Sequence, residues 1–323
     1  MSSTNAKPRM LVTGAAGFIG SHLVPRLLQT GHCVCGLVRG PNTSSESSRR
    51  RSAALEALQA QYQDGLQLIR PADAAALKQD LQRAKPEICV HLAGRSSVRE
   101  SVACPEQYVE ANYSATVGLL DALSACGCRR VVFASTVMVY GPDAPLPYRE
   151  AHLGSAPASP YGASKLAGEV LLNTYSALRK LETVNLRLFA VYGPDMRRDC
   201  VPWLIASAIR EGRPFTMFGD GSSTRDYIEV RDVLSAIEAA CAGRESHAAL
   251  NIGSGAGTTL RELIALLERH LALKAKLDCK PPVPGELAVA LPDISLAKEK
   301  LNWAPRVKIE EGMARLAEWV RRI

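Results

Sequence analysis

Tyr161 and Lys165 lie four residues apart in the segment PYGASK, where their types and spacing suggest proton chemistry. This spacing places two side chains on the same face of a helix. The phenol of tyrosine has an ordinary pKa of about 10, so it is a poor base at neutral pH. A nearby ammonium favours the phenolate and lowers that pKa. The pair is therefore a candidate for general acid–base catalysis.

A hydroxyl at the end of the apolar segment VVFAST could complete this pair. Thr136 is placed there, and we predict that it hydrogen-bonds a substrate oxygen. A tyrosine and a lysine four residues apart on a helix are common and usually structural. Their significance rises here because a glycine-rich turn, a strand-end hydroxyl and the Tyr–Lys pair follow one another in that order.

The glycine-rich turn is TGAAGFIG, between a predicted strand and a predicted helix. Gly14 allows a tight turn, Gly17 a close approach to a pyrophosphate, and Gly20 close packing of helix on strand. The free N–H groups at the helix start, near Phe18 and Ile19, then face the phosphates. A turn that binds no ligand is the alternative. We predict a dinucleotide site, in which an oxidised nicotinamide adds positive charge near Tyr161 and Lys165 holds its ribose.

The residue that ends the second strand bears on the choice of dinucleotide. An acidic residue there binds the ribose hydroxyls of NAD, whereas an arginine accommodates the 2′-phosphate of NADP. The chain has Arg39 at this point, with Arg49 to Arg51 as further cations. A solvated arginine is the other interpretation. We therefore expect NADP or NAD, with NADP favoured.

The elements that must position these residues alternate between strands and helices. The opening strand, helix and strand indicate a βαβ unit and hence a parallel sheet with helices on both faces. The Ser-, Pro- and Arg-rich stretch 41–52 is predicted to be a mobile loop. Beyond about residue 190 the regularity weakens and prolines recur, which indicates a looser second lobe. Strands are predicted at 9–13, 32–38, 66–69, 88–92, 131–135 and 183–188, and helices at 21–29, 74–84, 105–126 and 161–180. The predicted class is α/β, a doubly wound, Rossmann-type parallel sheet with a smaller C-terminal lobe.

Composition argues against several other classes of protein. The 323 residues carry a net charge of +7, but the basic residues are scattered and aromatic residues make up only 5%, which disfavours nucleic-acid binding. No apolar run reaches the roughly 18 residues that cross a bilayer, and the first residues lack a secretory signal. The nine cysteines include no CxxC pair and have no paired histidines nearby, so we expect no metal. A cytoplasmic enzyme is the expectation.

Together these motifs resemble the extended short-chain dehydrogenase/reductases that act on nucleotide sugars. The resemblance covers almost the whole chain and is specific for the superfamily, but not for the substrate. It is carried by TGAAGFIG, HLAG at 91–94, ESV-x-x-P with Tyr108 and Asn112, AST-x-x-VYG, PYGASK, RLF-x-VYGP at 187–194 and GDGSSTRDYIEVRDV at 219–233.

The resemblance implies a role for each matching residue. Tyr161 would be the catalytic acid and base, Lys165 its partner and ribose ligand, and Thr136 the hydroxyl that binds the sugar. Arg225 would contact the substrate diphosphate, unless it is a surface arginine paired with Asp226. The implied cofactor-binding residues are Gly14, Gly17, Phe18, Ile19, Gly20, Arg39, Leu92, Ala93, Gly94, Asn112, Tyr161, Lys165 and Phe189.

Departures from the family pattern narrow the activity. Members that dehydrate a sugar carry acidic residues directly after the strand-end threonine, where this chain has Val137 and Met138. Because dehydration needs an acid and a base for further proton transfers, a dehydratase is not expected. Ala190 replaces a common asparagine. Residues 283–286 lack the family's second arginine, so the diphosphate loses one charged hydrogen bond.

Three functions remain as hypotheses. The first is a nucleotide-sugar epimerase that inverts C4 by transient hydride transfer to bound NAD(P), as in UDP-glucose 4-epimerases. The second is an NADPH-dependent reductase of a nucleotide-linked 4-keto-6-deoxy sugar. The third is a non-catalytic dinucleotide sensor.

We predict a dinucleotide-binding domain of residues 1–186 plus about 226–253, and a lobe of about 187–225 plus 254–323 that binds a nucleotide-diphosphate sugar. The apolar stripes of 105–126 and 161–180 suggest a homodimer.

Overall fold

A computed structural model describes residues 7–38, 46–282 and 288–323 of the chain. The chain divides into two compact units. The first consists of Met1–Gly141, Ala156–Arg187 and Ile237–Leu250, and the second of Pro142–Ser155, Leu188–Ala236 and Asn251–Ile323. The predicted domains instead place 142–155, 226–236 and 251–253 with the dinucleotide-binding region. Which region binds which ligand stays a prediction.

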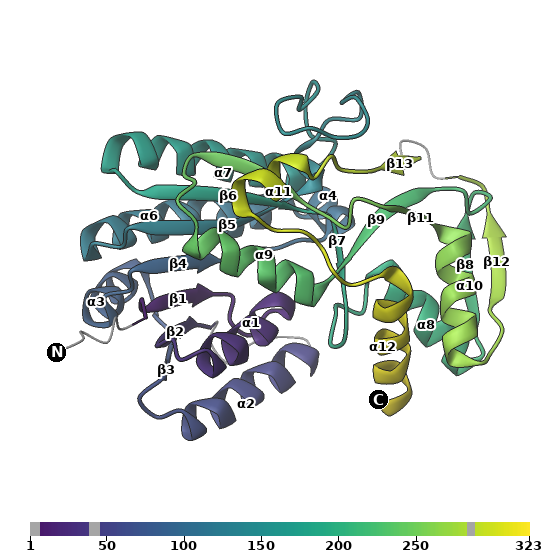
Figure 1. Ribbon diagram of the computed structural model, residues 1–323, viewed down its shortest axis with the longest axis horizontal. Coiled ribbons are helices and arrows are strands. Elements are labelled where there is room, and N and C mark those ends of the chain that lie inside the picture. Colours follow the sequence, from purple (N-terminus) through teal and green to yellow (C-terminus); the bar gives the residue numbers. More distant parts are fainter. Residues whose placement is uncertain (1–6, 39–45, 283–287) are drawn as a thin grey trace. The chain divides into compact units, whose positions relative to one another are not determined.

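The first unit is built on a seven-stranded sheet (Figure 1). Its order of strands is β10 (Ala248–Ile252), β6 (Glu182–Leu188), β5 (Arg130–Thr136), β4 (Ile88–His91), β1 (Met10–Thr13), β2 (Val34–Leu37) and β3 (Leu66–Ile69). From β3 to β5 every neighbouring pair is parallel. The chain moves outward from β1 in both directions, which is the doubly wound topology. The predicted fold class is confirmed.

Helices cover both faces of this sheet (Figure 1). α1 (Phe18–Gln29) packs with α2 (Glu46–Gln61), and α6 (Ala115–Cys126) packs with both α3 (Ala74–Ala84) and α7 (Pro160–Arg179). The short helices α4 (Val98–Ala103) and α5 (Pro105–Val109) contact α7. Leu120, Leu123 and Leu172 are fully buried in the core beneath α6 and α7. The apolar periodicity of these helices therefore follows the face that meets the sheet.

The predicted loop over residues 41–52 is wrong for its second part, because α2 begins at Glu46. Residues 41–45 lie outside the described part of the chain. α2 is hard to recognise because Arg51 and Leu55 are its only side chains described as buried. A helix that buries so little shows no apolar repeat in its sequence.

The second unit is more regular than its prolines suggest. A small sheet joins β7 (Ala190–Tyr192), β9 (Thr224–Glu229), β11 (Gly257–Thr259) and β13 (Val289–Ala290), and β8 (Pro214–Phe218) pairs in parallel with β12 (Lys276–Lys280). Its helices are α8 (Val201–Glu211), α10 (Leu260–Leu271), α11 (Ser295–Leu301) and α12 (Ile309–Arg322), while α9 (Val230–Ala242) begins in this unit and ends in the first. The expectation of a looser lobe is wrong. Pro202 lies in the first turn of α8, where the missing N–H has no intrahelical partner to lose.

Gly312 shows how closely this unit is packed. A Cβ at this position of α12 would overlap the phenol oxygen of Tyr192, which is itself almost fully buried. By contrast, a Cβ on Gly118 of α6 would meet no atom within 4 Å. Replacing glycine with alanine should therefore have opposite effects on the free energy of unfolding in the two helices.

We predict that Gly312→Ala lowers the free energy of unfolding by about 1–3 kcal/mol, because the methyl group overpacks a filled site. Gly118→Ala should raise it by about 0.5–1 kcal/mol, because alanine loses less conformational entropy in a helix. Urea denaturation of each variant, followed by circular dichroism, measures both changes. If Gly312→Ala were as stable as the unmodified protein, the tight contact with Tyr192 would be contradicted.

Candidate active site

The glycine-rich turn lies at the carboxyl end of β1, where the strand order reverses. Gly14 has φ +68°, and a Cβ on it would lie 2.9 Å from the backbone nitrogen of Ala93. A Cβ on Gly17 would lie 2.9 Å from the carbonyl oxygen of Gly14, and one on Gly20 would overlap the same oxygen. All three positions therefore require glycine. The turn also touches the loop that follows β4, which brings two of the predicted cofactor segments together.

The turn fits the pyrophosphate of a dinucleotide. Gly17 is the N-cap of α1 and supplies no side-chain hydrogen bond, and the first turn of α1 has no acidic residue. The N–H groups that open the helix and its positive dipole end thus meet no carboxylate of that turn. Arg51 of α2 donates to the carbonyl oxygen of Ala16 across 2.9 Å, which adds a guanidinium beside the turn. Arg39 lies outside the described residues.

A buried hydrogen-bond chain holds the loop after β4 in place. His91 contacts the hydroxyl of Thr13 through Nδ1 at 2.7 Å and that of Thr116 through Nε2 at 3.0 Å. Thr116 already donates to the carbonyl of Asn112, so Nε2 must carry the proton. Nδ1 then accepts from Thr13, whose oxygen accepts from the N–H of Ala93. A neutral imidazole satisfies every member of the chain. Burial, with the nearby charge of Lys165 acting in the same direction, lowers the pKa of His91 to about 3.

Asn112 links this loop to α7. It lies in a π-helical turn, Glu110–Ser114, inside the predicted long helix, and such turns are frequent at functional sites. Its amide oxygen accepts from the N–H of Arg95 at 2.7 Å, and its nitrogen donates to the carbonyl of Arg95 and the hydroxyl of Ser164. A Cβ on Gly94 would lie 2.7 Å from the same oxygen. The structure therefore uses Asn112 as a brace, and its direct contact with a cofactor stays a prediction.

Thr136 ends β5, while Tyr161 and Lys165 lie in the first turns of α7, a helix that contacts both β5 and the short turn that follows it. Ser159 caps α7, and a Cβ on Gly162 would overlap the carbonyl of Met138, just after Thr136. The first turn of α7 is thereby packed on the segment that follows the strand. Thr136 is 6% exposed and Tyr161 8% exposed, so both residues are buried but retain a small exposed area.

Lys165 is the most enclosed member of this group. It is 4% exposed, its Nζ donates to the carbonyl of Ala134 at 2.7 Å, and it lies 4.5 Å from the centre of the Phe133 ring. A Cβ on Gly94 would lie 3.5 Å from the same Nζ. Burial lowers the pKa of Lys165 to about 8, against the raising effect of Glu169. The ammonium is therefore still mostly charged at neutral pH.

A buried ion pair that involves the next turn of α7 was not predicted from the sequence. Glu169 and Arg187 each expose 4% of their side chains and meet through two pairs of atoms, at 3.0 and 2.7 Å. Ser135 donates to the same carboxylate, and Arg187 also donates to the phenol oxygen of Tyr140 at 3.1 Å. The available signal was Glu169 itself, a carboxylate one further turn along the helix face that carries Tyr161 and Lys165.

The two remaining predicted residues belong to the second unit. Phe189 is buried, and its ring centre lies 6.5 Å from that of Tyr148. Arg225 is half-buried and donates to the carbonyls of Thr224 and Ala288. Asp226, the suggested partner of Arg225, instead accepts from Ser254, Gly255 and Ala256. The two units are described separately, so the closeness of Phe189 and Arg225 to Tyr161 stays a prediction.

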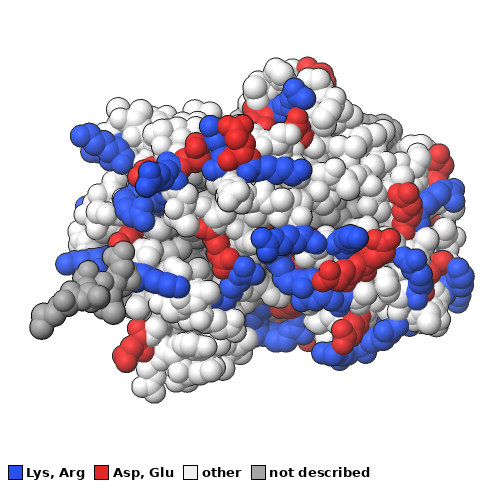
Figure 2. All heavy atoms as spheres, in the orientation of Figure 1, with Lys and Arg blue, Asp and Glu red and all other residues white. Residues whose placement is uncertain are grey.

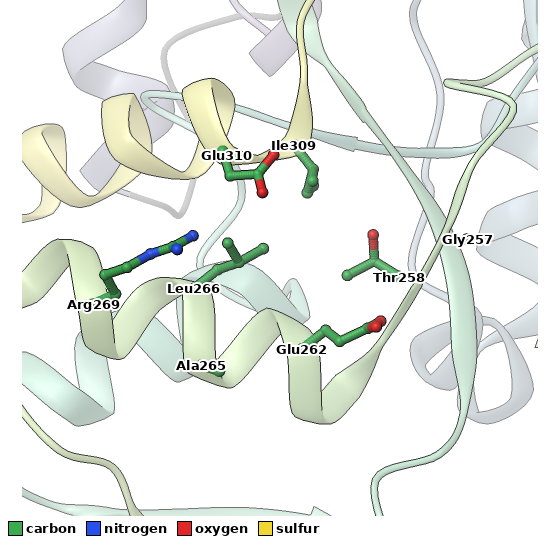
Figure 3. A pocket seen from close by; sticks show the side chains of 8 residues that line it. All are labelled: Gly257, Thr258, Glu262, Ala265, Leu266, Arg269, Ile309 and Glu310. Atoms are coloured by element: carbon green, nitrogen blue, oxygen red, sulfur yellow. The ribbon is translucent and has the colours of Figure 1, made fainter.

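The second unit also has an open hollow of about 500 Å³ between α10 and the start of α12 (Figure 3). It is lined by Gly257, Thr258, Glu262, Ala265, Leu266, Arg269, Ile309 and Glu310. None of these eight residues is a predicted ligand. On the face drawn in Figure 2, acidic and basic side chains are interspersed. Across the described ranges no cluster of three metal-binding side chains is found, and none of the helices described is long and apolar enough to span a membrane.

Comparisons with known proteins agree with this geometry. The family model for GDP-mannose 4,6-dehydratase matches residues 11–316. UDP-glucose 4-epimerase of Mycolicibacterium smegmatis is 38% identical over 319 residues, which is 97% of this chain and 98% of that protein. A probable UDP-glucuronate 4-epimerase of Rhizobium meliloti is 30% identical, over 96% of both chains.

Solved structures give the same picture. UDP-glucose 4-epimerase of Thermotoga maritima with UDP-glucose matches with a TM-score of 0.87 and 30% identity, over 97% of this chain and 99% of that one. UDP-glucuronic acid 4-epimerase of Bacillus cereus, in complex with UDP-glucuronic acid and NAD, matches with a TM-score of 0.87, 32% identity and the same coverage.

The neutral state of His91 has a consequence for stability. Its pKa is about 3 when folded and about 6.5 when unfolded, so between these values the unfolded chain binds a proton that the folded chain does not. Stability should be complete above about pH 6.5 and fall by about 1.4 kcal/mol per pH unit below it. Between pH 6.5 and pH 5 the free energy of unfolding of the unmodified protein should fall by about 2 kcal/mol more than that of the His91→Asn variant. Urea denaturation at both pH values measures this, and equal losses would contradict a buried neutral histidine.

Proposed function

The chain belongs to the GDP-mannose 4,6-dehydratase family. Within this family, we propose that it is a nucleotide-sugar 4-epimerase and not a dehydratase. The observation that carries this proposal is that Thr136, Tyr161 and Lys165 are buried in the unit that also contains the glycine-rich turn, which is suited to a dinucleotide. The two residues that follow Thr136 are apolar. The relatives named above that share nearly the whole chain are UDP-sugar 4-epimerases.

The proposed mechanism assigns one proton transfer to each half of the reaction. A bound nicotinamide dinucleotide supplies a hydride acceptor and donor. Tyr161 takes the proton of the C4 hydroxyl as the sugar is oxidised and returns it as the sugar is reduced. Thr136 donates a hydrogen bond to the same sugar oxygen. Lys165 favours the phenolate of Tyr161 with its charge and binds the nicotinamide ribose. Inversion follows when the keto sugar presents its other face before reduction.

Val137 and Met138 separate this activity from dehydration. Both follow Thr136 in a short 3₁₀ helix, Val137–Val139, and both are half-buried. Eliminating water from the sugar requires an acid and a base in addition to Tyr161. Neither side chain can give or take a proton. The geometry therefore supports chemistry at C4 alone, within a family whose model is named for a dehydratase.

We propose NAD as the cofactor and a UDP-linked hexose or hexuronic acid as the substrate. The Bacillus cereus enzyme is described with NAD, so the comparisons do not support the predicted preference for NADP. The substrates named for the relatives are UDP-glucose and UDP-glucuronic acid. Gly14, Gly17, Gly20 and the backbone of Phe18 and Ile19 would hold the pyrophosphate, while Arg225 would contact the substrate diphosphate.

We also propose a homodimer. Val170 and Leu178 lie two turns apart on α7 and are 59% and 74% exposed, and Val102 and Val109, on the adjoining α4 and α5, are 67% and 53% exposed. Large apolar side chains that are exposed on neighbouring helices are typical of interfaces between subunits.

The double variant Val170→Glu and Leu178→Glu should therefore be monomeric, because two carboxylates would be desolvated at the contact. Light scattering coupled to size-exclusion chromatography measures the mass. Val201→Glu, on an apolar residue of the second unit that is 39% exposed, is the control and should leave the mass unchanged. A monomeric unmodified protein would contradict the proposal.

The decisive test of the function is turnover by Tyr161→Phe. The unmodified protein should interconvert UDP-glucose and UDP-galactose, or the corresponding glucuronate pair, with no net change of absorbance at 340 nm. Removing the phenol oxygen should slow this by about 10²–10⁴-fold, the usual contribution of a general acid–base group. Cofactor binding, measured by fluorescence titration with NADH, should be retained. Steady consumption of NADPH with a 4-keto sugar would show a reductase instead, and binding without turnover of any nucleotide sugar would show a sensor.

A further inference from the structure

Glu169 is placed one helical turn beyond Lys165, on the face of α7 that also carries Tyr161. Residues four apart on a helix are neighbours, with about 5–6 Å between their Cβ atoms. Glu169 is 3% exposed, so its carboxylate is not screened by solvent. It is also the charged group whose influence opposes the effect of burial on Lys165. Glu169 thus lies one helical turn from Lys165 on a shared face of α7, where its charge favours the ammonium.

Side chains from two strands hold this carboxylate in place. Arg187 of β6 binds it through Nε and Nη2, and Ser135 of β5 adds the hydroxyl hydrogen bond. Arg187 is held in turn by Tyr140, through the hydrogen bond and through a ring whose centre lies 5.1 Å from its guanidinium carbon. Burial would lower the pKa of Arg187, but Glu169 raises it above its usual value. The guanidinium of Arg187 is therefore charged, and it meets the carboxylate in a buried ion pair.

Stability gives little reason for this arrangement. A buried ion pair must recover the cost of desolvating two charges, and apolar residues of similar size are often as good or better. Breaking such a pair by removing one partner, however, leaves an uncompensated charge in the core. We therefore expect that this pair serves to hold the carboxylate of Glu169 at a fixed place near Lys165, and not to stabilise the fold.

We propose that Glu169 is a positioning residue of the reaction: its carboxylate, clamped by Arg187 and Ser135, keeps the buried ammonium of Lys165 charged and directed at the carbonyl of Ala134. Lys165 in turn supports the phenolate of Tyr161. The inference rests on the proposed epimerase function and adds to it a charged group behind the catalytic pair.

The other groups around Lys165 leave Glu169 as the balancing charge. His91 on β4 is neutral, and Arg187 is a like charge that Glu169 screens. Arg95, beyond Gly94, is paired with Glu100 nearer the surface. The titratable and charged groups on the elements packed against α7 are His91, Arg95, Arg99, Glu100, Glu106, Tyr108, Glu110, Tyr113, Asp121, Arg130, Tyr140, Glu182 and Arg187.

Variants that neutralise each member of this pair in turn test the proposal. Glu169→Gln keeps the shape and leaves the guanidinium of Arg187 unneutralised beside Lys165. The alkaline limb of the pH profile for epimerisation reflects loss of the proton from Lys165. This limb should then move to lower pH by about one unit, the order of magnitude expected for one charge acting across a single helical turn. Arg187→Met leaves the carboxylate without its partner and should move the same limb up. The double variant should place the limb between the positions found for the unmodified protein and for Glu169→Gln, because it removes the supporting carboxylate and the opposing guanidinium together.

The experiment measures kcat/KM against pH for the interconversion, with folding checked by circular dichroism and NADH binding. Glu182→Gln is the matched control, because Glu182 pairs with the buried Arg130 at the other end of β6, at 2.7 Å. This control should leave the limb unmoved. A purely structural role would lower activity at every pH and would not move the limb in opposite directions. Should Glu169→Gln fail to fold, Arg187→Met still decides, because an unmoved or lowered limb in that variant overturns the proposal.

Failure of the proposed function would be seen separately. It would appear in the unmodified protein, as no interconversion of any UDP-sugar at any pH. The inference would then be tested by the pH dependence of NADH binding, since Lys165 is the proposed ribose ligand. Opposite shifts in Glu169→Gln and Arg187→Met would support it, and identical profiles would overturn it.

Discussion

The buried ammonium of Lys165 is the constraint on which the rest of the first unit depends. A cation with 4% exposure cannot be stabilised by water, so protein groups must replace its hydration. The carbonyl of Ala134 and the face of Phe133 supply direct contacts, and Glu169 supplies the opposite charge one turn away. Each of these lies on β5 or α7, so the strand and the helix must meet in one register. This requirement accounts for the overlap that any side chain at Gly162 would cause with Met138.

The two polar side chains His91 and Asn112 add no second positive charge beside Lys165. A second cation near Lys165 would destabilise it, and His91 avoids this by staying neutral within the Thr13–Thr116 hydrogen-bond chain. Asn112 then ties the loop after β4 to α7 through Ser164. Two loops and one helix are thereby held without any additional charge. The positive potential that a phosphate-binding turn needs comes from the backbone dipoles of α1 and from Arg51.

Much of this arrangement could be predicted from the sequence because it is local. Parallel strands such as β4 and β5 are continuous apolar runs, and the spacing of Tyr161 and Lys165 determines their common face. α2 could not be predicted, because a helix that buries little besides Arg51 has no apolar period. The Glu169–Arg187 pair was equally hidden, because 18 residues separate the partners and only the packing of β6 beside β5 makes them neighbours. The regularity of the second unit was missed for a related reason, since a proline in a first turn, as at α8, marks a helix start and not a loop.

The face of α7 that carries Tyr161, Lys165 and Glu169 explains why this site suits a single proton transfer. Each residue lies one turn deeper than the last, from a phenol at the edge of the core to a carboxylate within it. Charge alternates along this line, and the last carboxylate is already occupied by Arg187, so it has no free role as an acid or base. Val137 and Met138 add no ionisable group where the substrate would lie. Only Tyr161 is then left both near the surface of the core and able to exchange a proton. A site with one exchangeable proton can take the proton of a sugar hydroxyl and return it, while a bound nicotinamide would carry the hydride. It cannot also supply the acid and the base that the removal of water requires.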